Sequence, residues 1–251
     1  MLRQLARLVP RSLRSRFFGA IKKAAPHQFL PDHADLTFSQ GGEDRVLTFL
    51  FESLQIPKPR YLDVGTCHPC AMNNTYLFYL QGSTGVCVEP NPDLVPLIRE
   101  KRPKDVVLNV GVSPDGAGEC RYFMFVEPTL NTFDQVEAAA RTRSGKYPII
   151  RELSVPVVSL CSIIVDYFKD GLDLLSLDAE GLDFALLRSL DYRTTRPLAI
   201  CVETVGYSET PSKPKSPEIT SLLTGQGYAV FADTFVNTIY IDITRTGSFA
   251  L

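Results

Sequence analysis

Short apolar runs that end in a glycine or an acid recur along this chain and predict the strands of a parallel sheet. The run from Tyr61 to Val64 ends at Gly65, and the run from Gly85 to Val88 ends at Glu89. Between them, residues 75–80 are mostly apolar and aromatic, which is typical of the core-facing side of a connecting helix. Strand, glycine turn, helix, strand and terminal acid together predict the first half of a nucleotide-binding α/β sheet.

The later runs extend this pattern to a full sheet. Further strands are expected at residues 105–111, 120–125, 155–160, 173–177 and 198–202, with an antiparallel closing pair at 228–231 and 238–243. Helices are expected at residues 43–54, 92–100, 163–168, 184–190 and 219–223. Residues 126–153 do not fit a βαβ repeat, and we expect this insertion to form a lid over the strand ends.

The first 35 residues differ from the rest of the chain. Leu2, Leu5, Val9 and Leu13 recur at helical spacing, Pro10 interrupts the pattern, and residues 1–26 hold seven basic and no acidic side chains. A basic amphipathic segment of this kind binds an anionic membrane surface, or packs on its own domain or a partner with its basic face solvated. The predicted organisation is therefore a basic segment and linker at 1–35, followed by one domain at 36–251.

Charge and cysteine content narrow the classes of function. The net charge is −2 over 251 residues, so the chain beyond residue 26 carries −9 and is unsuited to binding nucleic acid. No apolar run reaches 18 residues, and no secretory signal is present. The six cysteines are then expected to be reduced, in a cytoplasmic protein that contacts the membrane at most peripherally through residues 1–25.

The turn after the first strand indicates the kind of ligand. Gly65 lets the backbone turn where a side chain would block a ligand, and Glu89 is placed to accept hydrogen bonds from ribose hydroxyls. A dinucleotide site requires further glycines for the pyrophosphate, and none follows Gly65 before Gly82. A ligand with an adenosine but no phosphate fits better, and S-adenosylmethionine is the common one; a dehydrogenase is disfavoured.

Acids also end the strands of the second half of the predicted sheet. Asp178 and Glu180 follow the run at 173–177, and Glu203 follows the run at 198–202, while Asp63 lies in the first strand. Carboxylates at the ends of apolar strands are costly to desolvate without a partner, so their convergence predicts a site for a cation, either a sulfonium or a metal ion. Capping of the helices that follow is the alternative.

Cys67 and Cys70 form the sequence Cys-His-Pro-Cys, which has the spacing of a redox or zinc half-site. A structural zinc site needs two more ligands at similar spacing, and none is present. A redox motif is also disfavoured, because the same loop has to admit the cofactor.

Together these motifs resemble those of the FkbM family of S-adenosylmethionine-dependent methyltransferases. The resemblance runs from about residue 38 to residue 243 and rests on Phe38-Ser39-Gln40, Gly42-Glu43-Asp44, Asp63-Val64-Gly65, His68-Pro69, Asn74-Thr75-Tyr76, Glu89-Pro90-Asn91-Pro92, Asp178-Ala179-Glu180-Gly181 and Glu203. The chain departs from the family in having Cys161 in place of an acid, and Leu182-Asp183 after the Asp-x-Glu-Gly motif.

The resemblance implies a three-layer, Rossmann-like sheet of seven strands and methyl transfer to an oxygen, often of a sugar, glycolipid or natural product. The residues expected to bind the cofactor are Gln40, Glu43, Asp63, Gly65, Asn74, Thr75, Glu89 and Asn91. The candidates for the base that takes the hydroxyl proton are Asp178, Glu180 and His68, in that order. A metal-assisted version would place Mg²⁺ on Asp178, Glu180 or Glu203. A non-catalytic adenosine-binding or membrane-docked scaffold is the alternative function.

Overall fold

The computed structural model describes residues 35–143, 145–205 and 215–246. From Thr37 onward these residues belong to one compact unit. Residues 1–34, which hold the basic segment with its expected membrane contact, and residues 206–214 lie outside the described residues. No helix among the described residues is long and apolar enough to cross a membrane.

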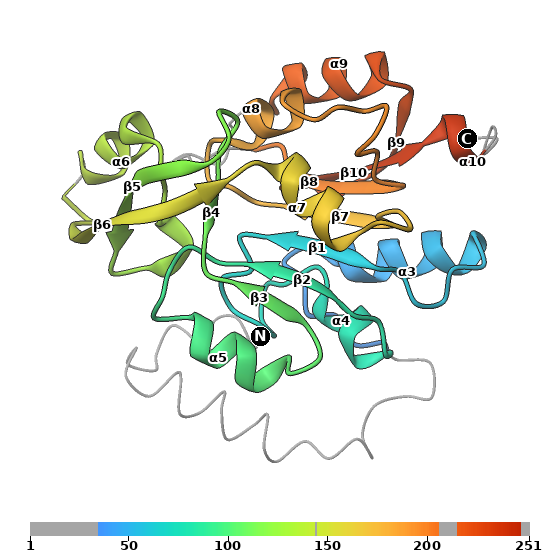
Figure 1. Ribbon diagram of the computed structural model, residues 1–251, viewed down its shortest axis with the longest axis horizontal. Coiled ribbons are helices and arrows are strands. Elements are labelled where there is room, and N and C mark those ends of the chain that lie inside the picture. The colour runs from blue at the N-terminus through green and yellow to red at the C-terminus, as the bar shows by residue number, and fades with distance from the viewer. Residues whose placement is uncertain (1–34, 144, 206–214, 247–251) are drawn as a thin grey trace, which may run out of the picture. The chain divides into compact units, whose positions relative to one another are not determined.

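The main sheet has seven strands in the order β3-β2-β1-β7-β8-β10-β9 (Figure 1). Its strands are β1 (Tyr61–Val64), β2 (Gly85–Val88), β3 (Val106–Leu108), β7 (Leu174–Leu177), β8 (Ala199–Glu203), β9 (Tyr228–Asp233) and β10 (Asn237–Asp242). The first five are parallel to one another, and β10 runs antiparallel to both β8 and β9. The expected fold, a mostly parallel sheet of seven strands with an antiparallel closing pair, is confirmed. The strand order reverses between β1 and β7, so the carboxyl ends of these two strands mark the edge where such sheets bind ligands.

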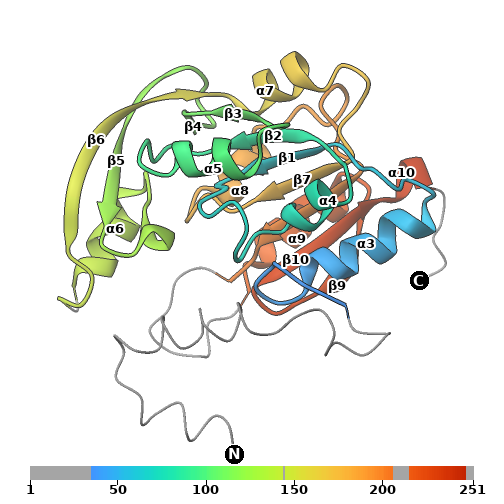
Figure 2. The same cartoon turned by 90° about the horizontal axis from the view of Figure 1, so that it is seen from below.

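Helices cover both faces of this sheet (Figures 1 and 2). One face packs on α7 (Leu160–Tyr167), α8 (Asp183–Arg188) and α9 (Pro217–Gly225), and the other on α3 (Glu43–Ser53) and α4 (Tyr76–Leu80), beside α5 (Val95–Lys101). Side chains alternate along β1, so both faces of the sheet receive apolar residues from it. Leu62 and Val64 pack in the core with α7, α8 and α9, and Tyr61 packs in the core with α3 and α4. A short helix, α10 (Ile243–Thr246), follows β10.

A second sheet of three strands lies next to the main one (Figure 1). It is formed by β4 (Gly111–Val112), β5 (Gly118–Phe125) and β6 (Ile149–Val158) in the order β4-β6-β5. The chain between β5 and β6 holds a 3-10 turn, η3 (Pro128–Leu130), and the helix α6 (Gln135–Thr142). We refer to residues 111–158 as the insert.

Two expected boundaries were wrong, and the insert explains both. The single strand expected at residues 105–111 is divided: Val106–Leu108 pairs with β2, whereas Gly111–Val112 pairs with β6 in the second sheet. The strand expected at 155–160 begins six residues earlier, at Ile149, because it pairs with β5 along its length. An apolar pattern gives the residues that are extended but not the partner that each strand finds.

Candidate functional site

A cavity of about 290 Å³ opens at the carboxyl ends of the parallel strands. Residues at the carboxyl ends of β1, β2, β7 and β8 line it together with residues of the insert. The insert contributes Gly111, Val112, Tyr122, Pro128, Thr129, Leu130, Asn131, Thr132 and Phe133. Six of the eleven residues predicted as site residues lie on the wall: Gln40, Gly65, His68, Glu89, Asp178 and Glu180.

Gly65 sits at the turn that brings β1 to the cavity. Its φ is +78°, which L-residues rarely adopt, and a Cβ atom here would lie 2.0 Å from the carbonyl oxygen of Asp178. The turn after β1 therefore packs directly against the end of β7. No other residue type fits this close approach.

Glu89 follows β2 and is buried at the cavity wall. Its two carboxylate oxygens accept hydrogen bonds from the backbone N–H groups of Cys67, at 2.7 Å, and Asn91, at 2.8 Å. Burial raises the pKa of Glu89 to about 7 although these bonds favour its charged form. The carboxylate is thus fixed in orientation, and each oxygen keeps a further lone pair for a ligand hydroxyl.

Three acids from two neighbouring strands form what we call the acidic edge: Asp178, Glu180 and Glu203. One carboxylate oxygen from each lies within 4.8 Å of the others, and all three residues line the cavity. Burial raises the pKa of Asp178 to about 6. Burial and the neighbouring carboxylates raise the pKa of Glu180 to about 8 and that of Glu203 to about 10. Like charges crowded in a low dielectric hold protons that isolated carboxylates would release.

Among the described residues, a buried arginine contacts the acidic edge without lining the cavity. Arg141, on α6 of the insert, is 1% exposed and places Nη2 at 2.7 Å from Oε2 of Glu180. Four carboxylates line the cavity itself, whereas no lysine or arginine among the described residues does. The wall therefore suits a ligand that carries positive charge.

Strained backbone gathers around the same cavity. Cys67, Met72 and Glu180 all have φ near +50°, in the left-handed region that non-glycine residues seldom occupy, and all three line the wall. Such residues persist only where the surrounding structure over-determines them, and they concentrate at ligand sites.

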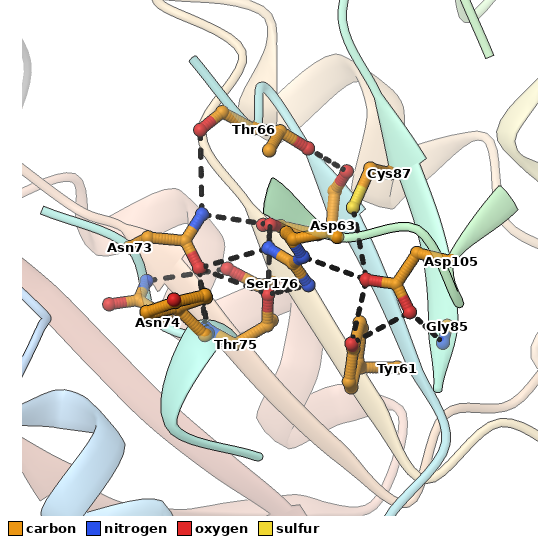
Figure 3. A network of polar contacts seen from close by, with 12 residues as sticks. Tyr61, Asp63, Thr66, Asn73, Asn74, Thr75, Gly85, Cys87, Asp105 and Ser176 are labelled. Carbon is orange, nitrogen blue, oxygen red and sulfur yellow. Dashed lines mark hydrogen bonds and ion pairs between the residues drawn. The ribbon is translucent and has the colours of Figure 1, made fainter. Parts of the chain in front are cut away.

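The remaining predicted cofactor residues lie behind the wall and not on it. The Asp63 carboxylate accepts hydrogen bonds from Asn73 Nδ2, at 3.0 Å, and Thr75 Oγ1, at 2.9 Å, and pairs with Arg102 Nη1 at 3.3 Å. Asp105 and Tyr61 continue this network on the other side of Arg102 (Figure 3). The structure thus places Asp63 and Thr75 where they hold the loop at residues 66–75 in shape.

Asn74, Asn91 and Glu43 also make structural contacts in this molecule. Asn74 Nδ2 donates to Ser176 Oγ at 3.3 Å, and Asn91 Oδ1 accepts from the backbone N–H of Asp93 at 3.0 Å. Glu43 accepts from Thr234 Oγ1, at 2.6 Å, and Asn237 Nδ2, at 3.0 Å, joining α3 to the turn between β9 and β10. Burial would raise the pKa of Glu43, but these hydrogen bonds bring it below its ordinary value.

His68 is oriented by its own loop. Its Nδ1 accepts from the backbone N–H groups of Cys70, at 3.1 Å, and Ala71, at 2.9 Å, and the residue lines the cavity. Cys67 and Cys70 are both free thiols. Burial and nearby carboxylates raise the pKa of Cys67 to about 12, so this thiol stays protonated and unreactive at neutral pH.

Sequence reasoning expected the insertion at 126–153 to lie over the strand ends, but it named none of the residues that the insert places on the wall as site residues. It also missed the two buried arginines, Arg102 and Arg141. Arg102 follows α5 and lies 39 positions from Asp63, with which it pairs. Nothing in the local pattern separates it from the exposed Arg99 on the same helix. The acids at the strand ends were the available signal for buried arginines, because buried carboxylates require cations.

The chain was compared with known proteins. The model of the methyltransferase FkbM domain matches residues 63–230, more than half of the chain. This protein belongs to the FkbM methyltransferase family. The expected family and the expected activity, methyl transfer from S-adenosylmethionine, are thereby confirmed.

Solved structures resemble this family member only distantly. A TehB-like SAM-dependent methyltransferase from Corynebacterium glutamicum shares 10% identity at a TM-score of 0.41, with 92% of this chain and 97% of that chain covered. A putative O-methyltransferase from Klebsiella pneumoniae shares 15% identity at a TM-score of 0.39, with 95% and 94% covered. Magnesium protoporphyrin IX methyltransferase from Synechocystis PCC 6803 shares 10% identity at a TM-score of 0.42, with 91% and 94% covered. No argument about activity rests on such values. A search of curated protein sequences gave no significant match.

Proposed function

We propose that this FkbM methyltransferase transfers the methyl group of S-adenosylmethionine to a hydroxyl oxygen of a sugar, glycolipid or natural product. The observation that supports this most is the acidic edge. Three carboxylates whose oxygens lie within 4.8 Å of one another line a cavity that also contains the Gly65 turn and Glu89. Carboxylates accept hydrogen bonds from hydroxyl groups and can take up their protons, and both steps are needed for methylation at oxygen.

We assign the cofactor to the side of the cavity formed by the ends of β1 and β2. Glu89 would accept the ribose hydroxyls, Gly65 would let the backbone approach, and Gln40 would contribute a polar contact from before α3. Asp63, Thr75, Asn74, Asn91 and Glu43 would act indirectly, since their side chains hold the loops and not the cavity wall. The four carboxylates on a wall without lysine or arginine, among the described residues, suit the positive charge of a sulfonium.

Asp178 is the favoured base. When bound, S-adenosylmethionine supplies a methyl group already activated by its sulfonium, so positioning contributes much of the acceleration. Asp178 lines the cavity, and a pKa of about 6 leaves it ionised at neutral pH while keeping it basic enough to accept a proton. Glu180 is engaged by Arg141, and Glu203 has a pKa of about 10. His68 remains the third candidate.

The acidic edge also has the donor chemistry of a magnesium site. Mg²⁺ prefers oxygen ligands and is usually held by one or two carboxylates. Asp178 and Glu203 fit this set, whereas Glu180 already pairs with Arg141. A metal there would hold the acceptor oxygen as a Lewis acid. Activity that is unchanged after treatment with EDTA would exclude this version of the mechanism.

Calorimetric titration with S-adenosylhomocysteine tests the cofactor assignment. We expect micromolar binding by the wild type, a large loss in Glu89→Ala, and no change in the control Glu100→Ala, an exposed acid. Acceptor screening would follow, beginning with glycans and lipid-linked sugars. Binding without any turnover, together with an acidic edge that tolerates substitution, would favour the alternative of a non-catalytic scaffold.

A peripheral membrane contact through residues 1–25 is part of the same proposal. The basic amphipathic sequence supports it, because seven basic residues without an acid attract anionic lipid. Co-sedimentation with anionic liposomes, with and without residues 1–25, measures the contact. Equal binding by the two forms would refute it.

A further inference from the structure

Arg141 joins two parts of the molecule that are far apart in the sequence. It lies on α6 of the insert and is among the largest fully buried side chains of the described residues. Its Nη1 donates to the carbonyl oxygen of Leu130 at 2.6 Å, and its Nη2 lies 2.7 Å from Oε2 of Glu180. Leu130 and Glu180 both line the cavity, whereas Arg141 does not line it. One guanidinium thus joins the insert to the turn after β7 from behind the cavity wall.

The turn that carries Glu180 needs support of this kind. Glu180 has φ +49° and Gly181 has φ +106°, so two consecutive residues are left-handed and the first of them is not a glycine. A backbone of this kind relaxes unless neighbouring groups hold it.

The insert supplies that support at three points. Arg141 pairs with the Glu180 carboxylate, and Thr132 Oγ1 donates to the Glu180 carbonyl oxygen at 2.9 Å. Glu137 packs so closely on Gly181 that a Cβ atom there would lie 3.1 Å from its Cγ. All three contacts come from residues 132–141. The conformation of the Asp-x-Glu-Gly turn therefore depends on the insert.

Arg141 also determines which carboxylate of the acidic edge has its negative charge balanced by a cation. Charged groups face Glu180 from four elements: Arg141 and Glu137 on α6, Asp178 after β7, Asp183 on α8 and Glu203 on β8. Arg141 is the cation in this set. A buried guanidinium requires an anion at contact distance, and Glu180 is the carboxylate at 2.7 Å, while Glu137 lies at 3.7 Å.

We propose that Arg141 is a positioning residue for the acceptor side of the active site, where it fixes the Glu180 carboxylate and the Leu130 wall relative to Asp178. This rests on the proposed function, because it assumes that the acceptor lies between the acidic edge and the insert. Glu89, on the cofactor side, does not depend on Arg141, since its carboxylate is held by the backbone N–H groups of Cys67 and Asn91, in the loops after β1 and β2.

The first test needs no acceptor. Glutamate carboxyl carbons labelled with ¹³C report the titration of Glu180, assigned by comparison with Glu180→Gln, in the wild type, Arg141→Met and the control Arg143→Met. Arg143 is exposed and lies two residues away. We expect Glu180 to titrate at a pH higher by about one unit or more in Arg141→Met, because an opposite charge in contact lowers a carboxyl pKa by roughly that amount. Arg143→Met should match the wild type. An unchanged titration in Arg141→Met would overturn the proposal.

The second test separates positioning from general structure. S-adenosylhomocysteine should bind Arg141→Met within about threefold of the wild type, whereas kcat on an identified acceptor should fall about 100-fold, as expected for a misplaced catalytic group. Arg141→Lys should recover part of kcat. An equal loss of cofactor affinity and turnover would refute the proposal.

Arg141→Lys and Thr132→Val serve if Arg141→Met does not fold. Thr132→Val removes one hydroxyl contact to the same turn, so it should lower kcat without weakening cofactor binding, and an unchanged kcat in both variants would refute the proposal. Failure of wild-type binding to S-adenosylhomocysteine would instead count against the proposed function, while the carboxyl titration would still report on Arg141.

Discussion

Two acidic regions of the main sheet differ in how their charge is balanced. Around Asp63, at the end of β1, two aspartates share the fully buried Arg102, with Nε at 2.7 Å from Asp105 and Nη1 at 3.3 Å from Asp63. Asn73 and Thr75 supply further hydrogen bonds (Figure 3). At the acidic edge, at the ends of β7 and β8, three carboxylates lie together, and in the part of the chain that the structure describes one buried guanidinium reaches one of them.

From this difference we infer that the first region is structural and the second is reactive. A network in which each buried charge has a partner stabilises one geometry and has no affinity left for a ligand. A cluster with excess negative charge is costly until a cation or a proton enters it. We therefore interpret the Asp63 network as the support of the cofactor loop, and the acidic edge as the place where chemistry occurs.

The largest expected effect is on stability, in the Asp63 network. Arg102→Met leaves two buried aspartates without their cation, and breaking a buried pair in this way costs about 3–5 kcal/mol. For a domain of this size we expect the melting temperature to fall by roughly 10 °C. Thermal unfolding of Arg102→Met beside Arg99→Met, an exposed arginine on the same helix, measures it. Equal melting temperatures for the two variants would show that the network is not structural.

The next effect is on turnover, at the acidic edge. Asp178→Asn removes the proposed base, and general-base catalysis contributes about 10²–10⁴-fold, so kcat should fall by that factor. Because asparagine keeps the shape of the side chain, the affinity for S-adenosylhomocysteine should change by less than about threefold. Steady-state kinetics and calorimetry on Asp178→Asn and on the exposed control Asp170→Asn test this. A variant with full turnover would exclude Asp178 as the base.

The smallest effect is a dependence of stability on pH. Glu203, Glu180 and Glu89 have folded pKa values of about 10, 8 and 7, above the ordinary value of 4.5. Since the folded state then binds more protons than the unfolded one, stability is fully present below about pH 4.5 and is lost as the pH rises through the folded pKa values. The ligand-free protein should therefore melt at a lower temperature at about pH 8 than at about pH 5.5.

Glu203→Gln removes one of these groups and should reduce that difference by about 2–4 °C, which corresponds to roughly 1 kcal/mol. Melting temperatures at both pH values, measured for the wild type, Glu203→Gln and the exposed control Glu52→Gln, give the comparison. A wild type that is more stable at the higher pH would mean that the acidic edge is not crowded with charge in solution.

The local pattern of apolar residues was sufficient to predict the main strands of this protein. Apolar runs ending in glycine or acid gave β1, β2, β7 and β8, because strands buried on both faces must be apolar along their length. The positions of Gly65, Glu89, Asp178 and Glu203 followed from the same runs. Parallel strands bring their carboxyl ends to one edge, so residues that are distant in sequence could be expected to meet.

Only the tertiary structure shows which charged residues pair when they lie far apart in the sequence. The sequence placed Asp63 among the cofactor residues, but whether its carboxylate faces a ligand or the interior depends on Arg102, 39 residues away. Glu180 is held by Arg141, also 39 residues away, and the insert that carries this arginine finds its second sheet by pairing β6 with both β4 and β5. Hydrophobic periodicity records which residues are buried, whereas the balance of buried charge is settled by contacts that form only when the chain has folded.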